Sequence, residues 1–230
     1  MAINFYNTAE GGTDGTTVTT GSTGGGSGTA MTLTTAGTGS LTFSTDVAHN
    51  GSLSYKLTPG SGSNCSVGWG VSGSRLVATR CYVYMTGYPS TPTQFVQLGN
   101  GSIVGLLGVA NTGNLLTQDI NGTISASIGT SSIPLNTWLR VELAADVGPT
   151  GSGDTSIWVA VYLGDDTTSP IYAYSTLAAS STTANMGTVR MGKVSNSGTW
   201  GTMYIDDLVV QSDVTTIGPA NTASSNWFYV

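Results

Sequence analysis

Apolar and polar residues alternate in short segments along most of the chain, and a few segments are apolar throughout. Both patterns are typical of β-strands, because successive side chains of a strand point to opposite faces of a sheet. No window has a convincing helical repeat, and the best candidate for a helical turn is 177–184. The pattern predicts strands at 3–6, 30–34, 40–44, 52–58, 63–71, 75–85, 93–98, 102–109, 114–120, 123–128, 138–146, 155–163, 171–175, 187–194 and 202–211.

Turn residues separate these segments, and Asn121-Gly122 between two apolar runs is the clearest hairpin signal. Many short strands joined by such turns predict an all-β fold, an antiparallel two-sheet jelly-roll sandwich with almost no helix. We expect one domain over residues 1–217, followed by a linker and an aromatic tail over 218–230. The Gly/Thr-rich segment 7–29 is expected to be an ordered excursion of that domain, although its composition also fits a flexible linker.

The segment 202–211 predicts a strand that is apolar on both faces, and therefore buried inside a covered sheet. Strict alternation puts Met203, Ile205 and Val209 on one face and Tyr204, Leu208 and Val210 on the other. Asp206 and Asp207 interrupt this strand, one on each face. We interpret both as structural residues: one holds a neighbouring loop, and the other reaches solvent.

Four motifs follow one another in the second half of the chain. They are Trp138-Leu-Arg-Val-Glu142, Ile157 to Asp166 with its Leu-Gly-Asp-Asp turn, Arg190-Met-Gly192, and Tyr204-Ile-Asp-Asp-Leu-Val-Val210. This succession resembles the concanavalin A-like, laminin G-type jelly rolls over about residues 130–212. The resemblance implies two stacked antiparallel sheets, with the first strand paired to the last. It implies little about function, because many activities share this fold.

Charged residues are scarce, at 8% of the chain against about 25% in typical proteins. Gly, Ser and Thr replace them, so we expect a neutral, hydrogen-bonding surface. The net charge is −6, and the six basic residues are scattered, which excludes a basic patch for nucleic acid. No apolar run is long enough to cross a membrane. The first residues, Met1 to Asn7, lack the features of a signal peptide, so we expect synthesis in the cytoplasm.

The two cysteines, Cys65 and Cys81, lie on either side of Ser72-Gly-Ser74. A three-residue hairpin there would place them opposite each other, and a disulfide would then contribute about 3 kcal/mol. Two buried free thiols are the favoured interpretation, because cross-strand disulfides are strained and a reducing compartment is expected.

The sequence lacks the residue patterns of the enzymes known on this fold. Retaining glycosidases of this type need two closely spaced carboxylates, but the only glutamates, Glu10 and Glu142, lie far apart in the chain. The lyases typically use an Arg or Gln, a His and a Tyr. The only histidine, His49, is in a His-Asn-Gly turn, where we expect it to face solvent. Arg140 and Glu142 are expected to form an ion pair on a sheet face. We therefore assign no catalytic residue and predict that the chain is not an enzyme.

The resemblance also implies calcium or sugar binding as possibilities to weigh. Calcium candidates are Asp146, Asp154, Asp165 and Asp166, but Asp165-Asp166 is more simply explained as turn chemistry, and no metal is assigned. For sugar stacking, the loop aromatics Tyr88 and Trp200 are the best candidates. The alternating pairs Tyr82 and Tyr84, and Tyr172 and Tyr174, are expected in the core.

Three aromatics, Trp227, Phe228 and Tyr229, stand near the end of the chain. Such a tail either plugs its own domain or docks on a neighbouring copy. The composition, the absent signal peptide and this tail together predict a non-enzymatic phage virion surface protein, either a capsid decoration or a minor tail component. It would dock on capsid or tail proteins at the virion surface as a homo-oligomer, such as a trimer, and contact host glycans. The alternatives are a lectin-like carbohydrate-binding module and a carbohydrate-active enzyme.

Overall fold

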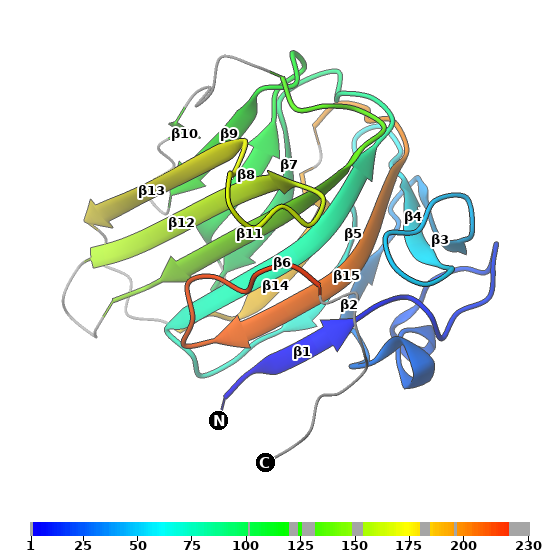
Figure 1. Cartoon of the computed structure of the whole chain (residues 1–230), viewed down its shortest axis with the longest axis horizontal. Helices are drawn as coiled ribbons and strands as arrows, with labels where there is room; N and C mark the ends of the chain where they lie inside the picture. Colours follow the sequence, from blue (N-terminus) through cyan, green and yellow to red (C-terminus); the bar gives the residue numbers. More distant parts are fainter. Residues whose placement is uncertain are drawn as a thin grey trace.

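Two antiparallel sheets stack face to face in the computed structural model, which describes residues 2–100, 102–119, 124–125, 132–148, 154–179, 185–195 and 197–220 (Figure 1). Sheet A contains, in spatial order, β13 (Tyr172–Ala179), β12 (Asp154–Leu163), β11 (Trp138–Asp146), β6 (Leu76–Met85), β15 (Met203–Ser212), β4 (Ser54–Thr58) and β3 (Ser40–Ser44). Sheet B contains β10 (Ile124–Ser125), β9 (Leu115–Asp119), β8 (Ile103–Val109), β7 (Thr93–Gly99), β14 (Thr188–Lys193), β5 (Cys65–Gly70) and β2 (Leu33–Thr35). The predicted all-β jelly-roll sandwich is confirmed.

The first strand, β1 (Asn4–Asn7), pairs with β15 in antiparallel register, with Asn4 opposite Gln211. The pairing of first and last strands, which the resemblance implied, is therefore present. The only helices among the described residues are two 3₁₀ turns, Thr20–Ser22 and Gly25–Ser27. No helix in this part of the chain is long or apolar enough to span a bilayer.

The core lies between the sheets, and alternation along each strand decides which side chains enter it. On β6, Cys81, Val83 and Met85 point into the core, whereas Tyr82 and Tyr84 point to the opposite face of sheet A. The tyrosines are thus not part of the core between the sheets, where the sequence analysis had placed them. They belong to the outer face of sheet A.

The Gly/Thr-rich N-terminal segment contains the two 3₁₀ turns and lies beside β1. Asn7 organises it: its side-chain Nδ2 donates to the carbonyls of Thr23 at 2.6 Å and Thr29 at 3.1 Å. Its Oδ1 accepts the amide of Ala9 at 3.1 Å. Farther along, the Glu10 carboxylate accepts two amides and a hydroxyl from Ser52 and Leu53, which ties this segment to the loop before β4.

A β-bulge interrupts β15 and corrects the predicted side-chain directions. The register against β6 shifts between Asp206 and Val209, and Asp207 adopts a positive φ of 48°. An extra residue in one strand reverses the alternation beyond it. The core therefore receives Met203 and Ile205 before the bulge, and Leu208 and Val210 after it.

The cysteines are free and buried, which confirms the interpretation as two thiols. Their predicted cross-strand register is wrong, because the chain changes sheets between β5 and β6. Cys65 lies in sheet B opposite Lys193, and Cys81 lies in sheet A opposite Val141.

Three further predicted segments lie wholly or partly outside the described residues. Residues 177–179 belong to strand β13, so the proposed helical turn is wrong over them, and 180–184 lie outside the described residues. Strands β9 and β10 pair in antiparallel fashion, as the Asn121-Gly122 signal predicts, and that turn itself is outside the described residues. Trp227, Phe228 and Tyr229 are also outside them.

Candidate active site on the outer face of sheet A

The strand registers of sheet A bring its polar outer positions into rows. Tyr82 on β6 lies between Asp206 on β15 and Arg140 on β11, and Arg140 lies opposite Tyr162 on β12. The adjacent row has Arg80 opposite Glu142. Half of the six basic residues of the chain lie on this face, namely Lys56, Arg80 and Arg140. The face therefore concentrates most of the side chains that could perform chemistry.

His49 lies on this face, in the connection between β3 and β4. Its ring stacks on Tyr82 with centroids 3.6 Å apart and planes inclined by 20°, and it meets the edge of Trp138 at 5.6 Å. The His49 side chain is only 7% exposed. The prediction that this histidine faces solvent is therefore wrong: the loop folds back over the sheet instead of projecting from it.

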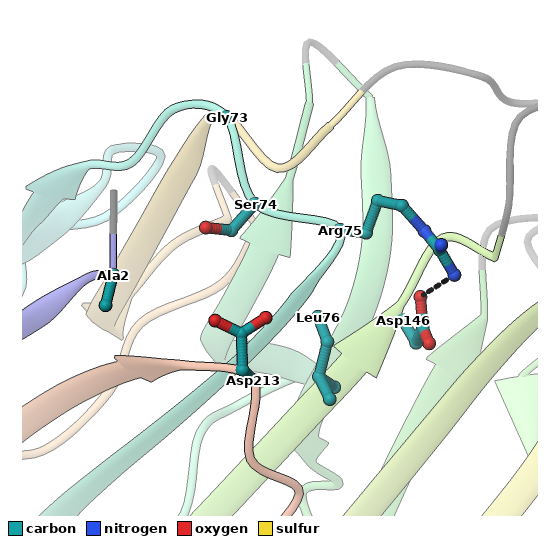
Figure 2. Close-up of a pocket in the computed structure, with 7 residues that line it drawn as sticks. All are labelled: Ala2, Gly73, Ser74, Arg75, Leu76, Asp146 and Asp213. Carbon is teal, nitrogen blue, oxygen red and sulfur yellow. Dashed lines mark hydrogen bonds and ion pairs between the residues drawn. The ribbon is translucent and has the colours of Figure 1, made fainter.

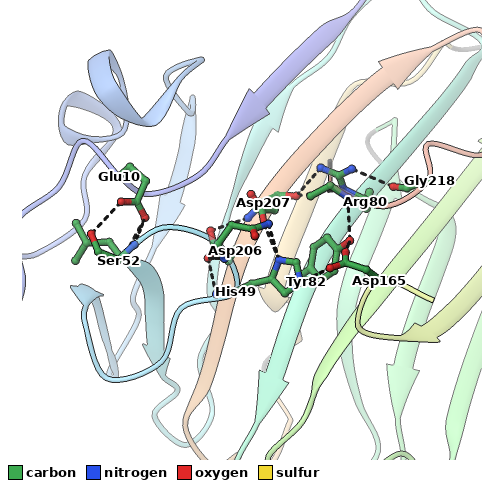
Figure 3. Close-up of polar contacts among 12 residues, drawn as sticks. Glu10, His49, Ser52, Arg80, Tyr82, Asp165, Asp206, Asp207 and Gly218 are labelled. Carbon is green, nitrogen blue, oxygen red and sulfur yellow. Dashed lines mark hydrogen bonds and ion pairs between the residues drawn. The ribbon is translucent and has the colours of Figure 1, made fainter. Parts of the chain in front are cut away.

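The bulge of β15 positions His49. The carboxylate of Asp206 accepts the backbone amide of His49 at 2.9 Å, and the carboxylate of Asp207 lies 2.7 Å from His49 Nδ1 (Figure 3). Asn50 Nδ2 also donates to Asp207, at 2.6 Å. Because a carboxylate only accepts hydrogen bonds, the imidazole donates to Asp207 from Nδ1, and Nε2 is held on the side of Asp165.

Both aspartates thus hold the same loop, so the expectation that one of them reaches solvent is wrong. Asp206 is completely buried, and its carboxylate also accepts the amide of Asp207 at 2.8 Å. Burial, and next the charge of Asp207, raise the pKa of Asp206 to about 8. Asp206 is a structural residue, whereas Asp207 orients the histidine directly.

The backbone carbonyl of Asp207, displaced from the ladder by the bulge, accepts Nε and Nη2 of Arg80 at 3.4 and 3.2 Å. The bulge therefore holds His49 through the side chains of Asp206 and Asp207, and it holds Arg80 through the backbone carbonyl of Asp207.

Asp165 joins the two stacked rings from the other side. The Tyr82 hydroxyl donates to Asp165 Oδ1, and His49 Nε2 lies 3.6 Å from Asp165 Oδ2 (Figure 3). Burial, and next this hydrogen bond to a carboxylate, raise the pKa of Tyr82 to about 12. The hydroxyl is therefore protonated at neutral pH, and its ring lies against the imidazole of His49.

Arg140 forms the predicted ion pair, with Nε 2.9 Å from Glu142 Oε1. Its guanidinium also lies over the ring of Tyr162, with Cζ 4.0 Å from the centroid. Among the described residues, the Nη1 atom of this almost completely buried side chain has no hydrogen-bond partner. An unsatisfied guanidinium nitrogen is costly when buried, which indicates a position for an oxygen of a ligand.

The sugar-stacking candidates from the sequence lie elsewhere. Trp200 is buried, with its Nε1 bonded to the Gly87 carbonyl at 2.9 Å and its ring packed edge-on against Phe95. Tyr88 packs against the core, and its hydroxyl donates to the Ile133 carbonyl at 2.6 Å. Trp200 therefore presents no free face to a sugar, whereas the partly buried Tyr88 stays a prediction.

The calcium candidates do not converge. Asp146 pairs with Arg75, Asp165 accepts from Tyr82, and Asp166 accepts the amide of Thr168 within its own turn. Within the part of the chain that the structure describes, no group of three or more metal-ligating side chains occurs. The Asp154 side chain is outside that part.

A pocket at the start of β6 is separate from this face. It is lined by Ala2, Gly73, Ser74, Arg75, Leu76, Asp146 and Asp213 (Figure 2). The guanidinium of Arg75 in this pocket is 3.4 Å from the Asp146 carboxylate, which partly neutralises its charge. This pocket combines no histidine or tyrosine with its charges, so it offers less chemistry than the outer face of sheet A.

Sequence reasoning missed His49 and Tyr82 as site residues. A usable signal was present in Arg80-x-Tyr82-x-Tyr84 and Trp138-x-Arg140-x-Glu142, where polar and aromatic residues occupy every second position of two strands. Such a face is suited to ligands. The partnership with His49 had no local signal, because it joins residues that are far apart in sequence.

Fold and topology place the chain among the concanavalin A-like jelly-roll sandwiches. No family model matches it, and no curated protein matches it in sequence. Solved structures do match. The cellulose-induced protein Cip1 is 17% identical with a TM-score of 0.55, covering 78% of this chain and 88% of its own. A marine PL-14 alginate lyase from Aplysia kurodai is 13% identical with a TM-score of 0.52, covering 75% of this chain and 87% of its own. A bifunctional GH43-CE protein from Bacteroides eggerthii matches at 10% identity and a TM-score of 0.50 through only 22% of its length.

These similarities establish the fold, and they overturn one prediction. The structures that share the sandwich include an alginate lyase and a GH43-CE protein, and none of those named here is described as a phage protein. The interpretation as a non-enzymatic virion surface protein is therefore wrong.

Proposed function

We propose that the chain is a carbohydrate-active enzyme that cleaves a polysaccharide on the outer face of sheet A. The observation that carries this proposal is the stack of His49 on Tyr82, with Asp207 at Nδ1 of the imidazole and Asp165 at the phenol. A proton acceptor and a proton donor lie side by side, each oriented by a carboxylate, which is the arrangement that general acid–base catalysis requires.

Elimination is the reaction that these groups fit best. In a polymer of uronic acids, a base takes the proton from C5, the bond from C4 to the glycosidic oxygen breaks, and a C4–C5 double bond forms. The leaving oxygen takes a proton from an acid. His49 Nε2 is the proposed base, and the Tyr82 hydroxyl is the proposed acid. A hydrolase would need two carboxylates aimed at the scissile bond, whereas Asp206 is buried and Asp207 is committed to His49.

The arginines favour an acidic polymer. Removal of the C5 proton is easier when a cation neutralises the adjacent carboxylate. Within the described part of the chain, Nη1 of Arg140 has no partner, and Nη1 of Arg80 is bonded to the carbonyl of Gly218. Both nitrogens belong to residues that neighbour Tyr82 on the same sheet face. They are the groups proposed to bind the uronate.

The test is to incubate the full chain with alginate, pectate and glucuronan, and with neutral cellulose and xylan as comparison. Elimination creates an unsaturated uronate, which is followed by its ultraviolet absorbance, and new reducing ends measure cleavage of any kind. We expect absorbance to rise with an acidic polymer. Tyr82→Phe and His49→Ala should each abolish the rise, whereas Tyr172→Phe, on the core side of β13, should retain it. Cleavage that persists in both site variants would overturn the assignment.

A carbohydrate-binding module is the second candidate. The half-buried rings of Tyr84, Trp138 and Tyr162 lie on the same face, and aromatic rings are stacking platforms for sugars. If this function applies, a polysaccharide will bind in affinity electrophoresis without any new reducing end or absorbance. Trp138→Ala should then weaken binding, and His49→Ala should have little effect.

A further inference from the structure

The chain after β15 turns back and crosses the outer face of sheet A, over β15 and β6 (Figure 1). We call residues 214–220 the strap. Its backbone makes four hydrogen bonds to the face, and every partner is a side chain of the candidate site. The amides of Ile217 and Gly218 donate to the two oxygens of Glu142, at 3.0 and 3.1 Å.

The other two bonds engage the proposed acid and one of the arginines. Arg80 Nη1 donates to the carbonyl of Gly218 at 3.0 Å (Figure 3), and the amide of Ala220 donates to the Tyr82 hydroxyl at 2.9 Å. The strap thus presents donors to Glu142 and Tyr82 and an acceptor to Arg80. Hydroxyl and carboxylate groups of a sugar chain can make the same bonds.

No strap side chain is fully buried: each residue from 214 to 220 is exposed or partly exposed. The strap is therefore attached mainly through these hydrogen bonds and not through the hydrophobic core. Segments with few buried apolar contacts are the ones that open locally at low cost. Ala220 of the strap bonds to the Tyr82 hydroxyl, Tyr82 itself is completely buried, and the His49 side chain stacked on it is 7% exposed. We expect displacement of the strap to open both rings to a ligand.

We propose that the strap is a built-in competitor of the substrate, which occupies the sugar-binding positions at Glu142, Arg80 and Tyr82 and is displaced when a polysaccharide binds. This inference rests on the proposed function for the identity of the ligand, but the opening of the strap can be measured without any ligand.

Gly218 offers a clean way to weaken the strap. It has a positive φ of 85°, and a Cβ there would meet no atom within 4 Å. Gly218→Ala therefore adds backbone strain to the strap without a steric clash. Gly73→Ala is the matched control, since Gly73 has a φ of 87° and equally open surroundings in the connection between β5 and β6.

The readout is carbethoxylation of His49 by diethyl pyrocarbonate, because the chain contains a single histidine. In the intact full chain, we expect Gly218→Ala to raise the rate about fivefold, the effect of the strain that an alanine adds at positive φ. Ile217→Pro, which removes one of the amide donors to Glu142, should act in the same direction. Gly73→Ala should leave the rate unchanged. Equal rates in the wild type and both strap variants would overturn the proposal.

Hydrogen exchange separates this inference from the proposed function. We expect the amides of Ile217, Gly218 and Ala220 to exchange faster when a polysaccharide such as alginate binds. If the polymer binds and these amides remain protected, the competitor proposal is wrong, while the function stands. If the strap variants accelerate carbethoxylation but no polysaccharide binds, the strap opens as inferred and the proposed function is wrong.

Discussion

The imidazole of His49 lies 3.6 Å from the phenol ring of Tyr82, although one residue comes from a loop and the other from the middle of a central strand. The connection between them passes through Asp207, whose carboxylate is 2.7 Å from His49 Nδ1 and whose carbonyl accepts Arg80 from the strand of Tyr82. A bulge in the last strand thereby holds a loop of the first half of the chain against the sheet.

Replacing Asp207 tests this relationship. Asp207→Asn removes the charge that fixes the imidazole proton on Nδ1, and asparagine tolerates the positive φ of 48°. We expect the rate of polysaccharide cleavage to fall by about 10²-fold, with little change in the midpoint of thermal unfolding. Asp207→Ala should lower both, because alanine disfavours this backbone conformation. A fully active Asp207→Asn variant would exclude His49 as an oriented base.

Stability should fall as pH rises from about 4 to about 8. The pKa of Asp206 is raised to about 8 in the folded chain, against 3.8 as its ordinary value. Between these values the native state binds a proton that the unfolded state has lost, so the free energy of unfolding decreases with pH and levels off above the folded pKa. Urea unfolding across this range measures the slope, and Asp206→Asn should flatten it. A steeper or unchanged slope in that variant would contradict the assignment.

Gly68 and Gly70 both lie in β5, and they differ in how closely neighbouring atoms approach them. A Cβ at Gly68 would lie 2.0 Å from the carbonyl oxygen of Val189 on the neighbouring strand, whereas a Cβ at Gly70 would meet only the Thr32 hydroxyl at 3.5 Å. We expect Gly68→Ala to lower the free energy of unfolding by about 2–4 kcal/mol and Gly70→Ala by less than about 1 kcal/mol. Urea denaturation followed by tryptophan fluorescence measures both, and equal effects would refute the close approach of β14.

The thiols should be present but unreactive in the native chain. Burial raises the pKa of Cys81 to about 12 and that of Cys65 to about 11, so neither forms a thiolate near neutral pH. Titration with a chromogenic disulfide should detect two thiols in denaturant and nearly none in the folded protein. A fast-reacting native thiol, or none after denaturation, would contradict the placement of the cysteines in separate sheets.

Local alternation was sufficient for most strands and for the ion pair of Arg140 with Glu142, because residues two apart in a strand share a face regardless of what surrounds it. It failed at β15, where one extra residue at the bulge reverses the face of Leu208 and Val210. It also failed for Cys65 and Cys81, since a short connection can form a hairpin or change sheets, and only the packing of the whole sandwich selects between them.

By itself, the sequence determined the all-β class and the two-sheet sandwich, since these follow from period-two patterns and turn residues along the chain. The pairing of the first strand with the last was implied by the resemblance to laminin G-type jelly rolls. Tertiary structure alone decided the site. His49, Tyr82, Asp165 and Asp207 come from four separate segments, and no local pattern encodes which loop folds over which strand. That choice depends on contacts between distant residues, namely the buried carboxyl group of Asp206, which accepts the backbone amides of His49 and Asn50.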